Sequence, residues 1–232
     1  MRTQQDKDII TSNISDPWII ENFLSKNDID LLIKFFYTSP DKIQKSTGPL
    51  TLDITQTELS HEPFKSVIDK LHTILGEFDV FTMLYFYVER PHIVHNDDSF
   101  DYPVCFKGIN IPLDFNGTEY PKFVFFDQYY LEGPAKFFNK SVDIPGWYNA
   151  HVYEYSQVQN LSNQTFSEEQ RLMYMSHVKS EWLEGLSMHS VVDSIPGNIT
   201  VFDTVRLHCA GNFLDQGTSS KLSLSIFTSL KV

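Results

Sequence analysis

Residues 221–230 read Lys-Leu-Ser-Leu-Ser-Ile-Phe-Thr-Ser-Leu, and the first part of this stretch alternates strictly between polar and aliphatic side chains. Successive side chains of a strand point to opposite faces, so Leu222, Leu224 and Ile226 share one face. The opposite face carries Lys221, Ser223 and Ser225. The pattern predicts a strand with one buried aliphatic face, and therefore a fold built on β-sheet.

Other stretches rich in aromatic and β-branched residues predict further strands at 18–20, 80–88, 103–113, 122–126 and 199–202. Apolar periodicity predicts helices at 27–37, 62–75 and 167–184, the first of them capped by Ser25 and the last by Ser167. Helices early in the chain and strands later favour an antiparallel β-sandwich backed by N-terminal helices.

The length of 232 residues suits one domain, 1–232. Residues 1–15 are polar, and we expect them to be loose. Residues 127–195 form a long aromatic and polar stretch, which predicts an insertion within the domain.

The net charge of −12 comes without a visible cluster of Lys and Arg, which argues against a nucleic-acid partner. Cys105 and Cys209 form no Cys-x-x-Cys pair, which excludes a thiolate zinc site. The chain shows no apolar signal segment and no run of transmembrane length, so we expect a soluble cytoplasmic protein with no membrane partner. Its oligomeric state does not follow from these features.

The segment 91–98, Pro-His-Ile-Val-His-Asn-Asp-Asp, has the residue types of a metal site. On an extended backbone, His95 and Asp97 point to the same side and present an imidazole and a carboxylate together. His208, expected near the end of the strand that begins at 199, is the best candidate for a third ligand. Two His and one carboxylate, with open positions left over, suit iron(II).

Other ligand sets remain open at this stage. His92 and Asp98 are rivals within the same segment, and His151 or His189 could replace His208. A polar turn without a metal would also explain a segment rich in Asn and Asp.

Lys221 follows His208 after one loop, 209–220, which could bring the last strand back beside that of His208. The Lys221 ammonium would then reach the same cavity and bind a carboxylate, with Ser223 pointing the same way. The plain alternative is a polar strand face turned to solvent.

With these residues in place, the sequence resembles the iron(II)/2-oxoglutarate-dependent oxygenases, and in particular their prolyl 4-hydroxylase-like branch. The matching residues are His95-Asn-Asp97, His208 and Lys221-Leu-Ser223, with weaker similarity at 18–25 and 107–114. The resemblance implies a double-stranded β-helix (a cupin-like jelly roll), with Fe(II) on His95, Asp97 and His208. It also implies that 2-oxoglutarate is bound by Lys221 and Ser223, and that O2 is the oxidant.

In that family a strand Tyr or Asn often assists the co-substrate, which makes Tyr85, Tyr87 and Asn110 candidates; the tyrosines could equally be core aromatics. The implied reaction is hydroxylation of a small-molecule or peptidyl substrate, with conversion of 2-oxoglutarate to succinate. The aromatic residues Phe137, Phe138, Trp147, Tyr148, Tyr153 and Tyr155 of the insertion could line a substrate cleft. A cupin-like metalloenzyme that does not use 2-oxoglutarate and a non-catalytic β-sandwich remain alternatives.

Overall fold

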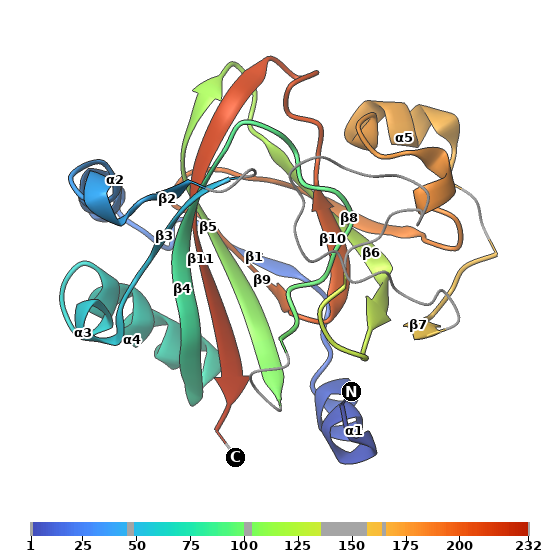
Figure 1. Cartoon of the computed structure of the whole chain (residues 1–232), viewed down its shortest axis with the longest axis horizontal. Coiled ribbons are helices and arrows are strands. Elements are labelled where there is room, and N and C mark those ends of the chain that lie inside the picture. The colour runs from blue at the N-terminus through green and yellow to red at the C-terminus, as the bar shows by residue number, and fades with distance from the viewer. Residues whose placement is uncertain (1, 46–48, 100–103, 136–156, 164–165, 232) are drawn as a thin grey trace.

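The protein is built from two antiparallel sheets, seen in a computed structural model that describes residues 2–45, 49–99, 104–135, 157–163 and 166–231 (Figure 1). The 7-stranded sheet has the order β1-β9-β5-β11-β4-β3-β2. The 4-stranded sheet has the order β10-β6-β7, and β8 also pairs with β6. This arrangement confirms the jelly-roll fold that the sequence predicted.

The strands of the larger sheet are β1 (Trp18–Ile20), β2 (Gln44–Lys45), β3 (Leu50–Asp53), β4 (Phe78–Val88), β5 (Cys105–Gly117), β9 (Ile199–Asp203) and β11 (Thr218–Leu230). The smaller sheet consists of β6 (Lys122–Tyr130), β7 (Val158–Gln159), β8 (Met188–Asp193) and β10 (Arg206–Ala210). All the pairings among these strands are antiparallel.

The alternation of the last strand has the expected structural result. Leu222, Leu224 and Ile226 on β11 are almost fully buried in the main hydrophobic core. This core lies between the larger sheet and the helices α2 (Lys26–Tyr37), α3 (Gln56–Leu59) and α4 (Phe64–Leu75), which cover its outer face (Figure 1). Ser25 caps α2 as predicted, because its side chain accepts a hydrogen bond from the Asp28 N–H.

The strand that carries His208 differs from the prediction. Instead of one strand running from residue 199 toward His208, the chain forms β9 in the larger sheet, turns, and forms β10 in the smaller sheet. The last strand, β11, accordingly pairs with β4 and β5 rather than with the His208 strand. The face of β11 that bears Lys221 is turned toward the smaller sheet, since the opposite face packs on the helices.

The segment 1–15, for which we expected a loose chain, contains a helix in its described part. Helix α1 (Gln4–Ser12) begins with a capping box between Thr3 and Asp6. Ile10 is buried against Val104 and Val205. Short-range capping and one apolar anchor thus outweigh the polar composition.

The region 127–195 is only partly an insertion, because β6 extends to Tyr130 and β8 belongs to the smaller sheet. Helix α5 (Glu168–Met175) is shorter than the predicted 167–184 and is followed by a 3-10 turn at Ser180–Trp182. The Arg171 guanidinium donates to the carbonyls of Ser176 and Val178, which ends the helix there. The aromatic residues proposed as a cleft lining, Phe137 to Tyr155, lie outside the described residues.

Among the described residues, no helix combines the length and the apolar character needed to cross a membrane.

Candidate metal centre

The His-x-Asp segment is held against β10 by backbone hydrogen bonds. The His95 N–H donates to the His208 carbonyl, and the His208 N–H donates to the His95 carbonyl, both at 2.9 Å. The Asp97 N–H donates to the Thr204 carbonyl at 2.8 Å. This short ladder keeps residues 95–97 extended, so that His95 and Asp97 both point toward His208.

Three donor groups converge at this point. Asp97 lies between the two histidines, with Oδ2 3.2 Å from His208 Nε2 and Oδ1 3.6 Å from His95 Nε2. One donor atom from each of the three residues lies within 4.8 Å of the others. Within the described part of the chain, this is the one such group of His, Cys, Asp or Glu residues. The spacing is that of a set of atoms able to share one cation.

The histidine orientations favour metal binding. His95 Nδ1 lies 2.7 Å from the Ile93 carbonyl, and His208 Nδ1 lies 2.9 Å from the Arg206 carbonyl. A carbonyl can only accept, so both Nδ1 atoms carry the proton and both Nε2 lone pairs are free for a ligand. Burial, with the neighbouring histidines, holds the pKa of His95 well below its usual range, so its ring is neutral at pH 7.

Aromatic side chains enclose the ring of His208, which is 1% exposed. The ring centroids of Phe123 and Phe202 lie 5.0 and 4.8 Å from that of His208. Gly108, which is opposite Phe202 in the sheet, makes this possible, because a Cβ there would lie 2.7 Å from the Phe202 ring. Among the residues around His208, Phe123 and Phe125 carry a local signal in the sequence, the i, i+2 spacing of aromatic residues on a predicted strand.

The rival ligands are directed elsewhere. His189 Nε2 lies 3.0 Å from an Asp16 carboxylate oxygen and does not belong to the group of three donors. The Asp98 carboxylate is bound by the guanidinium of Arg2. His92 Nδ1 lies 2.8 Å from His95 Nδ1, on the side of the His95 ring away from Nε2. His151 lies outside the described residues.

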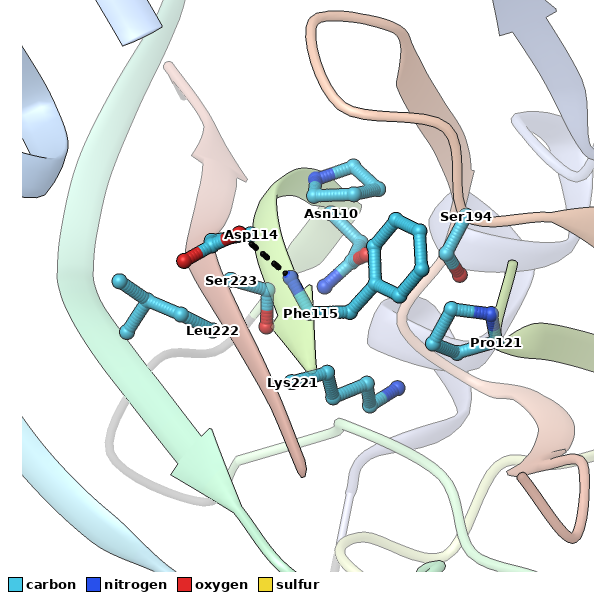
Figure 2. A pocket seen from close by; sticks show the side chains of 9 residues that line it. Asn110, Asp114, Phe115, Pro121, Ser194, Lys221, Leu222 and Ser223 are labelled. Atoms are coloured by element: carbon cyan, nitrogen blue, oxygen red, sulfur yellow. Dashed lines mark hydrogen bonds between the residues drawn. The ribbon is translucent and has the colours of Figure 1, made fainter. Parts of the chain in front are cut away.

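A small recess is lined by residues of β5 and β11 together with Pro121 and Ser194 (Figure 2). Its cavity volume is about 10 Å³, and its polar lining includes Lys221, Ser223 and Asn110. Pro121 and Ser194 close it from the side of the smaller sheet, and the Lys221 side chain extends toward Pro121. No local pattern in the sequence marks Pro121 or Ser194 as part of a site.

The recess and the three donors share the space between the sheets. Pro121, which lines the recess, directly precedes β6. Phe123 lies two residues later, about 7 Å along an extended chain, and its ring packs against that of His208. On β11, Ser223 and Ser225 continue the face of Lys221, and Asn110 Nδ2 donates to Ser225 Oγ at 3.3 Å. The structure therefore brings Lys221, Ser223 and Asn110 to the inner face of the larger sheet.

Tyr85 and Tyr87 lie on the other face of that sheet. They pair with Leu224 and Leu222, so they point toward the helices rather than toward Lys221. The Tyr85 hydroxyl is buried and donates to the Leu32 carbonyl at 3.0 Å. The suggestion that a tyrosine at 85 or 87 assists the co-substrate is thus wrong in this fold, and their alternative reading as core aromatics fits.

The ammonium of Lys221 is in an unusual setting. Burial lowers the pKa of Lys221 to about 8, an effect that Cys209 opposes only weakly. Its nitrogen lies 5.9 Å from the centroid of the Phe213 ring. A bound carboxylate would compensate this desolvated charge.

Known proteins resemble this chain in fold and not in sequence. No protein-family model matches the sequence, and no curated protein matches it. Solved structures do match in fold. The α-ketoglutarate-dependent carbocyclase SnoK of nogalamycin biosynthesis aligns with a TM-score of 0.55 at 11% identity, covering 98% of this chain and 84% of SnoK.

Two further structures align over similar lengths. The non-haem α-ketoglutarate-dependent epimerase SnoN, from the same biosynthesis, has a TM-score of 0.52 at 11% identity, covering 97% of this chain and 80% of SnoN. A prolyl-4-hydroxylase of Pseudomonas putida has a TM-score of 0.50 at 9% identity, covering 97% of each chain. The chain therefore shares the fold of these enzymes, at a sequence identity of only 9–11%.

Proposed function

We propose that this protein is an iron(II)- and 2-oxoglutarate-dependent dioxygenase that hydroxylates a small-molecule or peptidyl substrate. The observation that carries the proposal is the convergence of two imidazole nitrogens and one carboxylate from remote parts of the chain. Two histidines and one carboxylate, without a fourth protein donor in the described residues, are the donor set that favours non-haem iron(II) with open positions.

The residues fit this group in charge as well as in type. His95 and His208 would supply neutral nitrogen donors, because each Nδ1 proton is engaged by a backbone carbonyl. Asp97 would supply one negative charge and so offset part of the charge of a divalent cation. When bound together, iron(II), 2-oxoglutarate and O2 supply the oxidation of a C–H bond, with 2-oxoglutarate decarboxylated to succinate.

Lys221 is proposed to bind the distal carboxylate of 2-oxoglutarate. Its ammonium lines the recess, and the Ser223 hydroxyl on the same strand face can donate a second hydrogen bond. Asn110 also lines the recess, and its hydrogen bond to Ser225 fixes the orientation of the Asn110 amide. The rings of Phe123, Phe125 and Phe202 exclude water from the side of His208.

The proposed outcome of the reaction is hydroxylation. The proteins of this fold named above are an epimerase, a carbocyclase and a prolyl hydroxylase. A carboxylate at position 97 occupies the place that a halide would need, which favours hydroxylation over halogenation.

A direct test uses protein loaded anaerobically with iron(II) and given 2-oxoglutarate. We expect one metal ion per chain, and we expect succinate to accumulate once O2 is admitted, since slow turnover occurs without the true substrate. Iron uptake without any binding of 2-oxoglutarate would favour the cupin-like alternative. Failure to take up any divalent transition metal would favour the other alternative, a non-catalytic β-sandwich protein.

The pH dependence of 2-oxoglutarate binding provides an independent prediction. Burial lowers the pKa of Lys221 to about 8 in the free protein, and only the ammonium form attracts a carboxylate. Binding above pH 8 therefore requires proton uptake, and the dissociation constant should rise about tenfold for each pH unit above 8. Anaerobic calorimetry between pH 6.5 and 9.5, roughly the range around that pKa, measures it. A flat profile would show that Lys221 does not bind the ligand.

A further inference from the structure

The N-terminal arm, residues 2–16, is anchored to the body of the protein at several points. Lys7 forms an ion pair with Glu132, and Ile10 is buried under β5 and β10 beside Val104 and Val205. The Lys107 ammonium donates to the Ser15 hydroxyl at 2.8 Å. The Ser15 N–H donates to the Asp203 carboxylate, also at 2.8 Å. These contacts hold the arm without help from its first residues.

Arg2, at the start of the arm, makes a different contact. Its guanidinium binds both carboxylate oxygens of Asp98, with Nε 2.9 Å from Oδ2 and Nη2 against Oδ1. Nη2 also donates to the Ser99 carbonyl at 2.8 Å. The two side chains are 3% and 0% exposed, so this is a fully buried bidentate ion pair.

The pair is one residue away from the candidate metal ligand Asp97. On the extended segment, Asn96 and Asp98 point to the side opposite His95 and Asp97. Asn96 is fixed on that side, since its amide donates to the Tyr130 and Gly133 carbonyls and its oxygen accepts the Ala135 N–H at 2.7 Å. Asp97 thus stands between two buried polar anchors, one before it and one after it.

The Arg2–Asp98 ion pair adds a side-chain anchor directly after the backbone hydrogen bond from the Asp97 N–H to the Thr204 carbonyl. The rotation of the Asp97 backbone, and with it the direction of the carboxylate, depends on where Asp98 is held. Rigid placement of ligand atoms by residues behind them is a common determinant of metal affinity.

We propose that Arg2 is a positioning residue for the metal centre: by holding Asp98 it sets the direction of the Asp97 carboxylate and so raises metal affinity. The inference rests on the proposed metal site at His95, Asp97 and His208. It gives the N-terminal arm a role in metal binding, although the arm is remote in sequence from the three donors. It also explains why Asp98 itself is not a ligand.

The test compares Arg2→Gln with Lys7→Gln, a matched change on the same arm that removes an ion pair in which Asp98 takes no part. Each protein is titrated anaerobically with Co²⁺ alone, against a competing chelator, and the visible spectrum of the bound Co²⁺ is recorded. We expect Arg2→Gln to weaken Co²⁺ binding about tenfold or more and to shift the spectrum, as loss of an outer partner does. Lys7→Gln should stay within about twofold, and Arg2→Lys should recover part of the loss.

Leaving Asp98 buried and unpaired could unfold the protein, so a second variant is included. The double variant Arg2→Gln with Asp98→Asn removes both charges and avoids an uncompensated one. It should fold, by its thermal melt, and still bind Co²⁺ about tenfold more weakly. Wild-type affinity for Co²⁺ in Arg2→Gln, or in the double variant, would overturn the inference. Absence of Co²⁺ binding to the wild type would instead refute the metal site itself.

Discussion

The His208→Gln variant is expected to lose metal binding and, with it, all formation of succinate. His208 contributes a buried nitrogen donor that lies 3.2 Å from the Asp97 carboxylate. Loss of an outer partner of a ligand costs about 10–100-fold in affinity, and loss of the ligand itself should cost more. Glutamine keeps most of the ring volume, which limits the cavity beside Phe123 and Phe202. Anaerobic metal titration and a succinate assay measure both effects.

A matched control for this variant is His61→Gln. His61 is exposed near helix α3, where its Nδ1 lies 2.7 Å from the Thr57 carbonyl, far from the three donors. This control should bind metal as the wild type does. If His208→Gln keeps wild-type metal affinity while remaining folded, the metal lies elsewhere and the proposed function loses its basis.

The Lys221→Met variant should bind the metal normally but bind 2-oxoglutarate about 10–100-fold more weakly. A hydrogen bond to a charged group contributes roughly 1.5–3 kcal/mol, and about 1.4 kcal/mol corresponds to a factor of ten. Methionine preserves an unbranched apolar stem beside Phe213 while removing the charge. The variant should also lose the rise in dissociation constant above pH 8. Calorimetry of 2-oxoglutarate binding to the anaerobic, metal-loaded protein provides both readouts.

Lys122→Met is the corresponding control. Lys122 is next to Pro121 at the edge of the recess, but its ammonium is paired with Asp193 at 2.7 Å. Removing a partly exposed ion pair should change 2-oxoglutarate affinity little. Equal loss in both lysine variants would indicate a general electrostatic effect, whereas an unchanged affinity in Lys221→Met would refute the assignment of the recess.

Metal loss and co-substrate loss are separable in this design. The three donors stand on β10 and on the segment bonded to it, whereas Lys221 and Ser223 stand on β11 in the facing sheet. A change in one sheet leaves the hydrogen-bond ladder of the other intact. The two variants therefore test two halves of one site, and each half can fail without the other.

Local patterns in the sequence determined which side chains share a strand face and where two helices begin. The alternation of residues 221–226 placed Lys221 and Ser223 on one face and the leucines on the other, because side chains of a strand alternate whatever the fold. The same rule put His95 and Asp97 on one side of their segment. Ser25 and Ser167 marked helix starts, because capping is decided within four residues.

Only the tertiary structure decided which strands face one another. His208 was expected near the end of the strand that begins at residue 199, yet the chain crosses between sheets after Asp203, and this crossing brings His208 opposite His95. Tyr85 and Lys221 are on paired strands but opposite faces, because the register of β4 against β11 sets the face and no local pattern encodes it. The pairing of Arg2 with Asp98 was equally hidden, since a contact between residues remote in sequence exists only once packing has brought the two segments together.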